Sequence, residues 1–517
     1  MAFLGPFIIL ESAARLISSP GTYDAIEKTL YRQNFQPRKK EGEYRVFLFG
    51  ESTMHGSHLY PKSTIGIWLK LYLENLLGPK AAKDVTIYNL SRLGVNSHFI
   101  KQVFLDTLHY KPDLVVFYTA HNDTALRDDK WDILDTSFSR RANKLFKNLI
   151  KKSALISACR RAAVRRRMRR RGQDSQESEK IKEGWYDHTN KRYYSKDDQL
   201  DPASSGARTI IRLWQDNIRE IIRVCRRRKI PVIFFSGLAR YDAFEPYASV
   251  HDKSLTAEGK AAWEKNFKRA QKYYEKKDYS KAAAFYEKCL KIDPTYALTY
   301  FRLGMCYERL ENFALAKKFY VMANDADFTP IRGPSAMGRF YDALKKENQP
   351  GVYVIPTQEI FEARSPNGMI TSRLVVDQLH PTMRGQAIMA LEICRIMAEH
   401  DLFKKKNKWR WAKLKDFETL SQNININEDF RFRTLLWSAR YVGSYFDKAE
   451  EFLDQAVRIR PKSLAARSQL AWIYWKTGQR KKAAGMYRQL IREFPDEASA
   501  FLARCPEIYS LLEVSPQ

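Results

Sequence analysis

The sequence predicts an α/β fold built on a parallel sheet and joined to modules made only of helices. Two observations carry this prediction. Short continuous apolar runs alternate with helical patterns between residues 44 and 122, as is typical of parallel strands buried on both faces. Elsewhere a helical pattern repeats at an interval of 34 residues, which indicates stacked helix pairs. The 517 residues exceed one ordinary domain, so we expect several units.

The predicted sheet has five strands, which are apolar runs rich in β-branched and aromatic residues: 44–49, 85–90, 113–119, 230–237 and 351–356. Amphipathic helical patterns lie between or after these runs, at 64–77, 208–228 and 383–399. The long gaps between the third and fifth strands indicate that one α/β domain is interrupted twice.

The predicted organisation follows from these interruptions and from the ends of the chain. It comprises an N-terminal apolar segment (1–20), a first part of the α/β domain (44–254) with a basic insertion (125–207), inserted repeats (255–345), a second part of the α/β domain (346–402) and C-terminal repeats (425–517).

The two repeat blocks are recognised by aligned small and aromatic residues. Ala282 and Ala316 lie 34 positions apart, as do Ala449 and Ala483, and prolines close the C-terminal units. This pattern resembles the tetratricopeptide repeat. The resemblance implies that the blocks bind a protein partner. Because about two repeats cannot bury their apolar faces alone, we expect each block to stack on the other or on the α/β domain.

The chain is strongly basic. Its 89 Lys and Arg against 59 Asp and Glu give a net charge of +30, which attracts anionic partners. Residues 145–171 mix apolar residues with Lys and then carry eight arginines. We interpret this run as a basic amphipathic helix on an anionic membrane surface, the alternative being a solvated helix end. We expect no nucleic-acid partner, because aromatic platforms are absent from the run.

The first residues, MAFLGPFIILESAARLI, are apolar but too short for a full membrane span. They favour a membrane anchor or an interfacial helix over a helix packed on the domain. We therefore expect a membrane-associated protein of bacterial type that faces the periplasm or the cell exterior. The six cysteines show no paired spacing, so no disulfide scaffold is predicted; several fall on apolar helix positions, where a cysteine is usually buried.

Polar residues follow several of the predicted strands. The stretches in question are FGESTMHG (49–56), NLSRLGVNS (89–97), TAHND (119–123) and DQLHPTMRGQAIMA (377–390). The carboxyl ends of parallel strands share one edge of a sheet, so these stretches can converge there. Taken alone, Ser52 in the first stretch suits either a nucleophile or the cap of a following helix.

The combined residue types suit acyl transfer. Ser52 would attack an ester carbonyl, His380 would accept its proton, and Asp377 would orient the imidazole. The backbone N–H groups of Ser52 and Gly94 and the side-chain amide of Asn122 would form an oxyanion hole.

These stretches, in this order, resemble the SGNH hydrolases, also called GDSL esterases and lipases. The family's blocks are matched at Ser52, Gly94, Asn122, Asp377 and His380. The resemblance implies a three-layer α/β/α sandwich, favours Ser52 as the nucleophile, and implies no metal or organic cofactor. Spacing alone invites a metal site at His55 and His58, but no set of further ligands completes it.

Two positions depart from the family pattern. Glu51 replaces the usual Asp before the serine, from which we expect altered packing and not lost activity. Ala120 stands where the family has Gly, which would narrow the pocket or change the loop; we expect the adjacent His121 to be a surface imidazole.

The function that follows is hydrolysis of a carboxylic ester, such as an O-acetyl group on a glycan or a lipid ester. Two alternatives remain open. The same residues serve an O-acyltransferase, in which a sugar hydroxyl replaces water. The chain could instead be a repeat-based envelope scaffold whose hydrolase domain is vestigial.

Overall fold

The computed structural model describes residues 35–57, 59, 62–125, 200–242, 244–403, 409–424, 426–442, 446–497 and 512. The N-terminal segment 1–20, the basic run 145–171 and His58 lie outside the described residues, so the predictions made for them remain predictions.

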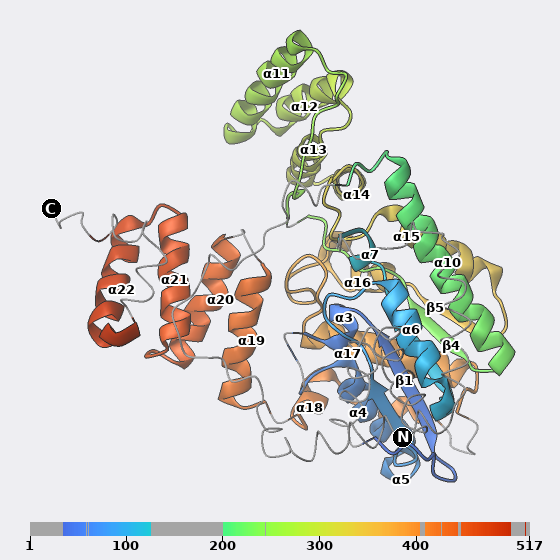
Figure 1. The fold of residues 1–517 in the computed structure, drawn as a ribbon. Coiled ribbons are helices and arrows are strands. Elements are labelled where there is room, and N and C mark those ends of the chain that lie inside the picture. Colours follow the sequence, from blue (N-terminus) through green and yellow to red (C-terminus); the bar gives the residue numbers. More distant parts are fainter. Residues whose placement is uncertain are drawn as a thin grey trace, which may run out of the picture.

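A five-stranded parallel sheet forms the centre of the molecule. Its strands are β1 (Tyr44–Gly50), β2 (Val85–Asn89), β3 (Leu114–Tyr118), β4 (Val232–Phe235) and β5 (Val352–Ile355). They are ordered β2-β1-β3-β4-β5, and every neighbouring pair is parallel. The predicted strands are therefore confirmed, and all their carboxyl ends lie along one edge (Figure 1).

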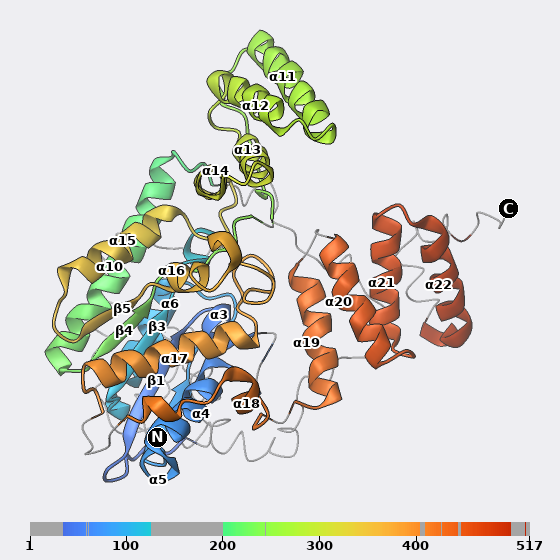
Figure 2. The ribbon, with the colours of Figure 1, turned by 180° about the vertical axis from the view of Figure 1, so that it is seen from behind.

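Helices cover both faces of the sheet. One face packs against α4 (Ile65–Leu77) and α17 (Met383–Glu399), which share a buried core with alternate strand residues. The other face packs against α6 (Ser97–Thr107), α10 (Ser205–Arg228) and α15 (Ser335–Glu347). Figure 2 shows α17 and α4 together on their side of the sheet. The predicted three-layer α/β/α sandwich is confirmed.

Short helices complete the α/β domain at its loops. These are α3 (Ser52–His55), α5 (Pro79–Ala82), α7 (Asn122–Ala125), α16 (Thr357–Glu362) and α18 (Phe417–Ser421).

The domain's boundaries differ from the predicted ones at two places. Met337, Tyr341 and Leu344 of α15 belong to the sheet core, so the inserted repeats end before α15 and not at residue 345. Beyond residue 402, Phe403 and Leu420 join the core under α4 and α17. Both differences arise because apolar residues next to the repeats find their partners on the sheet.

The repeats are antiparallel helix pairs. The inserted block contains α11 (Ala257–Glu275), α12 (Tyr279–Ile292), α13 (Ala297–Arg309) and α14 (Phe313–Asp325). The C-terminal block contains α19 (Glu428–Tyr441), α20 (Phe446–Ile459), α21 (Leu464–Lys476) and α22 (Arg480–Glu493). Small residues allow the close packing: a Cβ on Gly304 would lie 2.6 Å from the ring of Tyr320.

Each block buries a core of its own and extends from the sandwich in a different direction (Figure 1). The C-terminal block also packs on Phe244, in the loop that follows β4, where Lys448 lies 4.2 Å from the ring centroid. The expectation that a block packs on the α/β domain is met at this contact.

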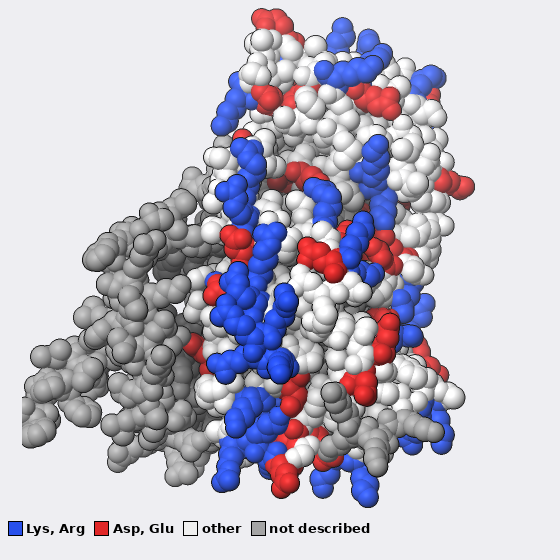
Figure 3. Space-filling view, turned by 90° about the vertical axis from the view of Figure 1, so that its right-hand side faces the viewer, with Lys and Arg blue, Asp and Glu red and all other residues white. Residues whose placement is uncertain are grey.

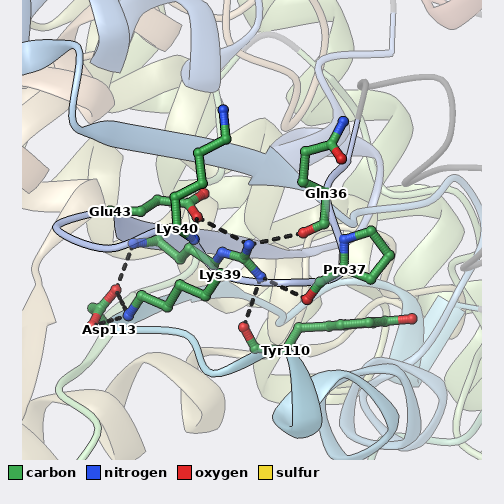
Figure 4. A network of polar contacts seen from close by, with 8 residues as sticks. Gln36, Pro37, Lys39, Lys40, Glu43, Tyr110 and Asp113 are labelled. Carbon is green, nitrogen blue, oxygen red and sulfur yellow. Dashed lines mark hydrogen bonds and ion pairs between the residues drawn. The ribbon is translucent and has the colours of Figure 1, made fainter.

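The amino ends of the strands are held by a polar network around Arg45 (Figure 4). The buried guanidinium donates to the carbonyls of Tyr110 at 2.9 Å and Gln36 at 2.8 Å, and pairs with Glu43 at 3.0 Å. Asp113 accepts the backbone N–H of Arg45 at 2.6 Å. The network fixes residues 36–43 beneath the sheet, at the edge opposite the carboxyl ends.

The described cysteines, namely Cys225, Cys289, Cys306 and Cys394, are buried free thiols, as expected of small apolar residues. Among the described residues, no helix combines the length and the apolar character needed to cross a membrane.

Candidate active site

The polar stretches found in the sequence meet at the carboxyl edge of the sheet. Ser52 begins α3 directly after β1, and Asn122 begins α7 after β3. Gly94 lies in the loop after β2, while Asp377 and His380 lie between β5 and α17. Because the strands are parallel, one edge gathers residues that are more than 300 positions apart in the sequence.

Three side chains form a continuous hydrogen-bonded chain. The Nε2 atom of His380 lies 2.8 Å from Oγ of Ser52, and its Nδ1 atom lies 2.7 Å from Oδ2 of Asp377. His380 and Asp377 are 6% and 3% exposed, so water competes little for these contacts. This is the geometry in which an imidazole can accept a serine proton while a carboxylate fixes its tautomer.

Asp377 is held by its own backbone as well as by the imidazole. Its Oδ1 atom accepts the N–H groups of Leu379 and His380, each at 2.8 Å. Burial alone would raise the pKa of Asp377, but the charge and hydrogen bond of His380 and the two backbone N–H groups outweigh it. The pKa therefore lies below its ordinary value, and the carboxylate stays ionised.

The segment carrying Asp377 and His380 is a tight loop that the sequence shapes locally. Val376 donates its N–H to the carbonyl of His380 at 2.9 Å, and the hydroxyl of Thr382 caps α17 by accepting the N–H of Gly385. A Cβ on Gly385 would lie 2.5 Å from the carbonyl oxygen of Leu374. Glycine is therefore required where the loop turns back against the helix.

Helix α3 is tied directly to this loop. Gln386 of α17 donates its side-chain N–H to the carbonyl of Thr53 at 2.9 Å, in a buried contact. The bond links the residue after Ser52 to the helix that follows His380. It thus keeps the Ser52 and His380 backbones in a fixed relation.

Glu51 joins the serine loop to the asparagine loop. Its buried carboxyl accepts the backbone N–H groups of Ala120 at 3.1 Å and Asn122 at 3.0 Å. Burial and the nearby Asp123 raise the pKa of Glu51 to about 8, against the opposing effect of those N–H groups. The residue lies outside the Ser52–His380–Asp377 chain, as expected, but it positions Asn122.

The three predicted oxyanion donors lie in three loops at this edge. Ser52 offers its N–H at the start of α3, and Asn122 keeps its side chain in place by donating from Nδ2 to the carbonyl of Val95 at 2.9 Å. Gly94 adopts φ of +62°, and a Cβ there would meet nothing within 4 Å. Its left-handed conformation, and not crowding, favours glycine.

Asp123 links the loop after β3 to the loop after β2. Its carboxylate accepts the backbone N–H of Ser97 at 3.0 Å and the Ser97 hydroxyl at 2.5 Å. Burial raises the pKa of Asp123 to about 6 against these hydrogen bonds. The loop after β2 and the loop after β3 are thereby fixed to one another.

The expectation of a surface imidazole at His121 was wrong. The side chain is 1% exposed, and burial together with the nearby His380 lowers its pKa to about 3. Two glycines on neighbouring loops approach Ala120: a Cβ on Gly333 would lie 2.5 Å from the Ala120 carbonyl oxygen, and one on Gly237 would lie 3.4 Å from the Ala120 Cβ. Sequence spacing gave no sign of these approaches.

Sequence reasoning missed the loop after β4. The backbone N–H of Arg240 donates to the carbonyl of Gln378 at 2.8 Å, and the Gln378 side chain donates to the hydroxyl of Tyr247 at 2.8 Å. Gln378 stands between Asp377 and His380, so this loop supports the segment that carries them. The available signal was its place after a parallel strand, the same rule that located the other stretches.

The described residues contain no cluster of three or more His, Cys, Asp and Glu arranged to hold a metal ion. Of the pair considered for a metal, His55 is described, and burial lowers its pKa to about 4.

The fold and the site define a three-layer α/β protein with a Ser-His-Asp chain at its carboxyl edge. Family models described as tetratricopeptide repeat match residues 263–296, 285–318 and 446–505. The chain thus contains tetratricopeptide repeats in both predicted blocks.

Solved structures that resemble the chain include both kinds of protein. A GDSL-like lipase from Bacteroides thetaiotaomicron is 12% identical, with 73% of this chain and 98% of that chain covered and a TM-score of 0.29. A provisionally named acylhydrolase from Bacteroides fragilis is 11% identical, with 74% and 98% covered and a TM-score of 0.31. A tetratricopeptide protein from Thermus thermophilus is 14% identical, with 48% and 99% covered and a TM-score of 0.15. No curated protein matches the chain.

Proposed function

We propose that the chain is a serine esterase that hydrolyses carboxylic esters. The observation that carries the proposal is the unbroken hydrogen-bonded chain from Ser52 through His380 to Asp377. A buried Ser-His-Asp chain at the end of parallel strands suits nucleophilic acyl transfer, because the carboxylate orients the imidazole and the imidazole accepts the serine proton.

In the first half of the reaction, Oγ of Ser52 attacks the ester carbonyl as Nε2 of His380 takes the hydroxyl proton. Asp377, ionised and bonded to Nδ1, stabilises the imidazolium that forms. The tetrahedral oxyanion is stabilised by the N–H groups of Ser52 and Gly94 and by the amide of Asn122. The imidazolium then protonates the leaving alcohol, which departs as the acyl-serine forms.

In the second half, water replaces the alcohol. His380 accepts a proton from the water as the water oxygen attacks the acyl-serine, and the tetrahedral intermediate then collapses by breaking the bond between the acyl carbon and Oγ. The carboxylic acid departs while the imidazolium returns the proton to Oγ of Ser52. An O-acyltransferase would use the same residues with a sugar hydroxyl in place of water. The substrate class we propose is an O-acetylated glycan or a lipid ester.

The repeats would bind a protein partner, in keeping with the surfaces that stacked helix pairs present. We also propose that the protein works at an anionic membrane surface facing the periplasm or the cell exterior. The support for this location is in the sequence: the apolar segment 1–20 and the basic run 145–171. Replacing Arg165, Arg166 and Arg167 with Gln should weaken flotation with anionic vesicles, and unchanged flotation would contradict it.

The esterase proposal is tested with a fluorophosphonate probe and with p-nitrophenyl esters of increasing acyl length. The probe should label Ser52, and Ser52→Ala should abolish labelling and lower turnover by about 10⁴-fold or more. Asn122→Ala should lower kcat by about 10²- to 10³-fold while labelling persists at a reduced rate. Labelling that maps to another residue, or turnover that survives in Ser52→Ala, would contradict the assignment.

A further inference from the structure

Helix α10 presents a row of arginines to solvent. Its apolar residues, among them Trp214, Ile218 and Ile221, face the sheet. The exposed face carries arginines at spacings of four, seven, four and three residues, which place them on one side of a helix: Arg208, Arg212, Arg219, Arg223 and Arg226. Figure 3 views the side of the molecule on which α10 and α15 lie, and shows Lys and Arg gathered in a long column there.

A groove runs beside the C-terminal half of this row. It lies between α10 and α15 and has a volume of about 530 Å³. Four arginines line it, namely Arg219, Arg223, Arg226 and Arg227, together with an apolar floor and a single acidic residue, Glu347. The lining therefore carries a net charge of +3, from four arginines and one glutamate.

These arginines are weakly neutralised by the protein. Arg219 lies 5.3 Å from the ring centroid of Phe340 and 3.6 Å from Asp216, in an exposed pair that contributes little. Arg226 reaches the side-chain oxygen of Gln349 at 3.5 Å. Within the described part of the chain, Arg223 and Arg227 make no hydrogen bond or ion pair. Guanidinium groups in this state can pair with carboxylates of a ligand.

We propose that the α10–α15 groove binds an acidic polysaccharide through its carboxylate groups. The arginines form a narrow row and the groove is concave, which suits a linear polyanion. A helix that lies in a membrane exposes large apolar residues, whereas the apolar residues of this groove form its floor, and no exposed large apolar residue of the described chain lies on α10 or α15. The aromatic ring present, Phe340, is only partly exposed and lies against Arg219, so it does not form an open platform for bases.

The direction of the row connects the groove to the site. Helix α10 precedes β4 and runs antiparallel to it, so its N-terminal end lies at the carboxyl edge of the sheet. Arg212 and Arg208 continue the row toward that edge. For its link to catalysis the inference rests on the proposed esterase function: a bound acidic chain would lead from the groove toward Ser52, and the substrate would be an acylated acidic glycan.

The test compares two variants of the full chain. One carries Gln in place of the four groove arginines, and the matched control carries Gln in place of four exposed lysines of α11: Lys260, Lys265, Lys268 and Lys272. Both lose four charges, so nonspecific attraction falls equally. Binding of polygalacturonate, with dextran as the neutral polymer, should weaken by about thirtyfold in the groove variant and by no more than about threefold in the control, as expected for four surface ion pairs.

Equal weakening in both variants would overturn the proposal. So would a groove variant that loses binding to single-stranded DNA or to phosphatidylglycerol vesicles while keeping its affinity for polygalacturonate. Circular dichroism melts establish that both variants fold. Turnover of p-nitrophenyl acetate should be unchanged by the groove substitutions, and binding is measured without turnover. A protein that binds polygalacturonate through the groove but hydrolyses no ester would refute the esterase proposal alone.

Discussion

Replacing Asp377 with Asn tests the proposed roles at a single atom. In the structure Oδ1 accepts two backbone N–H groups, from Leu379 and His380, while Oδ2 faces Nδ1 of His380. Asn has the same shape but only one oxygen. The single amide oxygen can therefore accept hydrogen bonds either from the two backbone N–H groups or from Nδ1 of His380, but not from both.

The two backbone N–H groups determine the orientation of the amide. If the amide oxygen took the place of Oδ2, the NH₂ group would face two buried N–H groups, and leaving each unpaired costs about 1–3 kcal/mol. The oxygen should instead stay at the Oδ1 position, with the NH₂ group toward Nδ1 of His380. The imidazole must then carry its proton on Nε2, where it cannot accept the proton of Ser52. We expect kcat to fall by about 10⁴-fold, or about 5.5 kcal/mol in the barrier.

The assay is turnover of p-nitrophenyl acetate, with a thermal melt of each variant. Asp342→Asn, at an exposed position of α15, is the control for the chemical change alone. An Asp377→Asn variant that melts like the wild type yet keeps kcat within about tenfold would refute the reasoning, since the expected loss for the wrong tautomer is far larger.

Two further predictions concern the supports of the site. Burial and Asp123 raise the pKa of Glu51 to about 8 from an ordinary 4.5. The stability linked to the proton of Glu51 is therefore present below about pH 4.5 and is lost as pH rises through 8. The melting temperature of the wild type should fall more steeply between pH 5 and 9 than that of Glu51→Gln, and equal slopes would contradict this. Gly333→Ala places a Cβ against the Ala120 carbonyl at a residue whose φ is +70°, so it should lower the free energy of unfolding by about 1–3 kcal/mol and reduce turnover. Gly338→Ala is the control, because a Cβ there meets open space. Equal melting temperatures of the two variants would contradict the proposed crowding at Gly333.

The sequence was sufficient for the sheet and for the residues at its carboxyl edge. Continuous apolar runs identify strands buried on both faces, and the parallel arrangement brings their ends together whatever their separation along the chain. That is why Ser52 and His380 could be paired before any geometry was known. The 34-residue period likewise identified the repeats, because stacked helix pairs demand small residues at fixed positions.

Contacts between loops could not be predicted in the same way. Nothing in the order of residues indicates that Glu51 accepts N–H groups from the loop after β3, or that Gly333 approaches Ala120, because such approaches depend on the positions of three separate loops. The buried state of His121 has the same origin. The boundary at α15 was misplaced because its apolar residues follow a helical period that suits a repeat and a sheet-covering helix equally.

The loop after β4 lies between the inserted block and the candidate active site and contacts both. Asp327, just beyond α14, accepts the backbone N–H groups of Tyr247 at 2.8 Å and Ala248 at 2.9 Å, and Arg332 donates to the Phe244 carbonyl at 2.8 Å. The hydroxyl of Tyr247 in turn accepts a hydrogen bond from the side-chain amide of Gln378, which lies two residues before His380.

The segment that joins the inserted block to α15 thus holds, through buried and partly buried hydrogen bonds, the loop that supports the Asp377–His380 segment. The C-terminal block contacts the same loop at Phe244, which packs into the core of that block. Replacing Asp327 with Ala would leave the backbone N–H groups of Tyr247 and Ala248 without their carboxylate acceptor, each at a cost of about 1–3 kcal/mol, and would loosen the loop that contacts Gln378. The connection between the inserted block and α15 is therefore a structural part of the candidate active site.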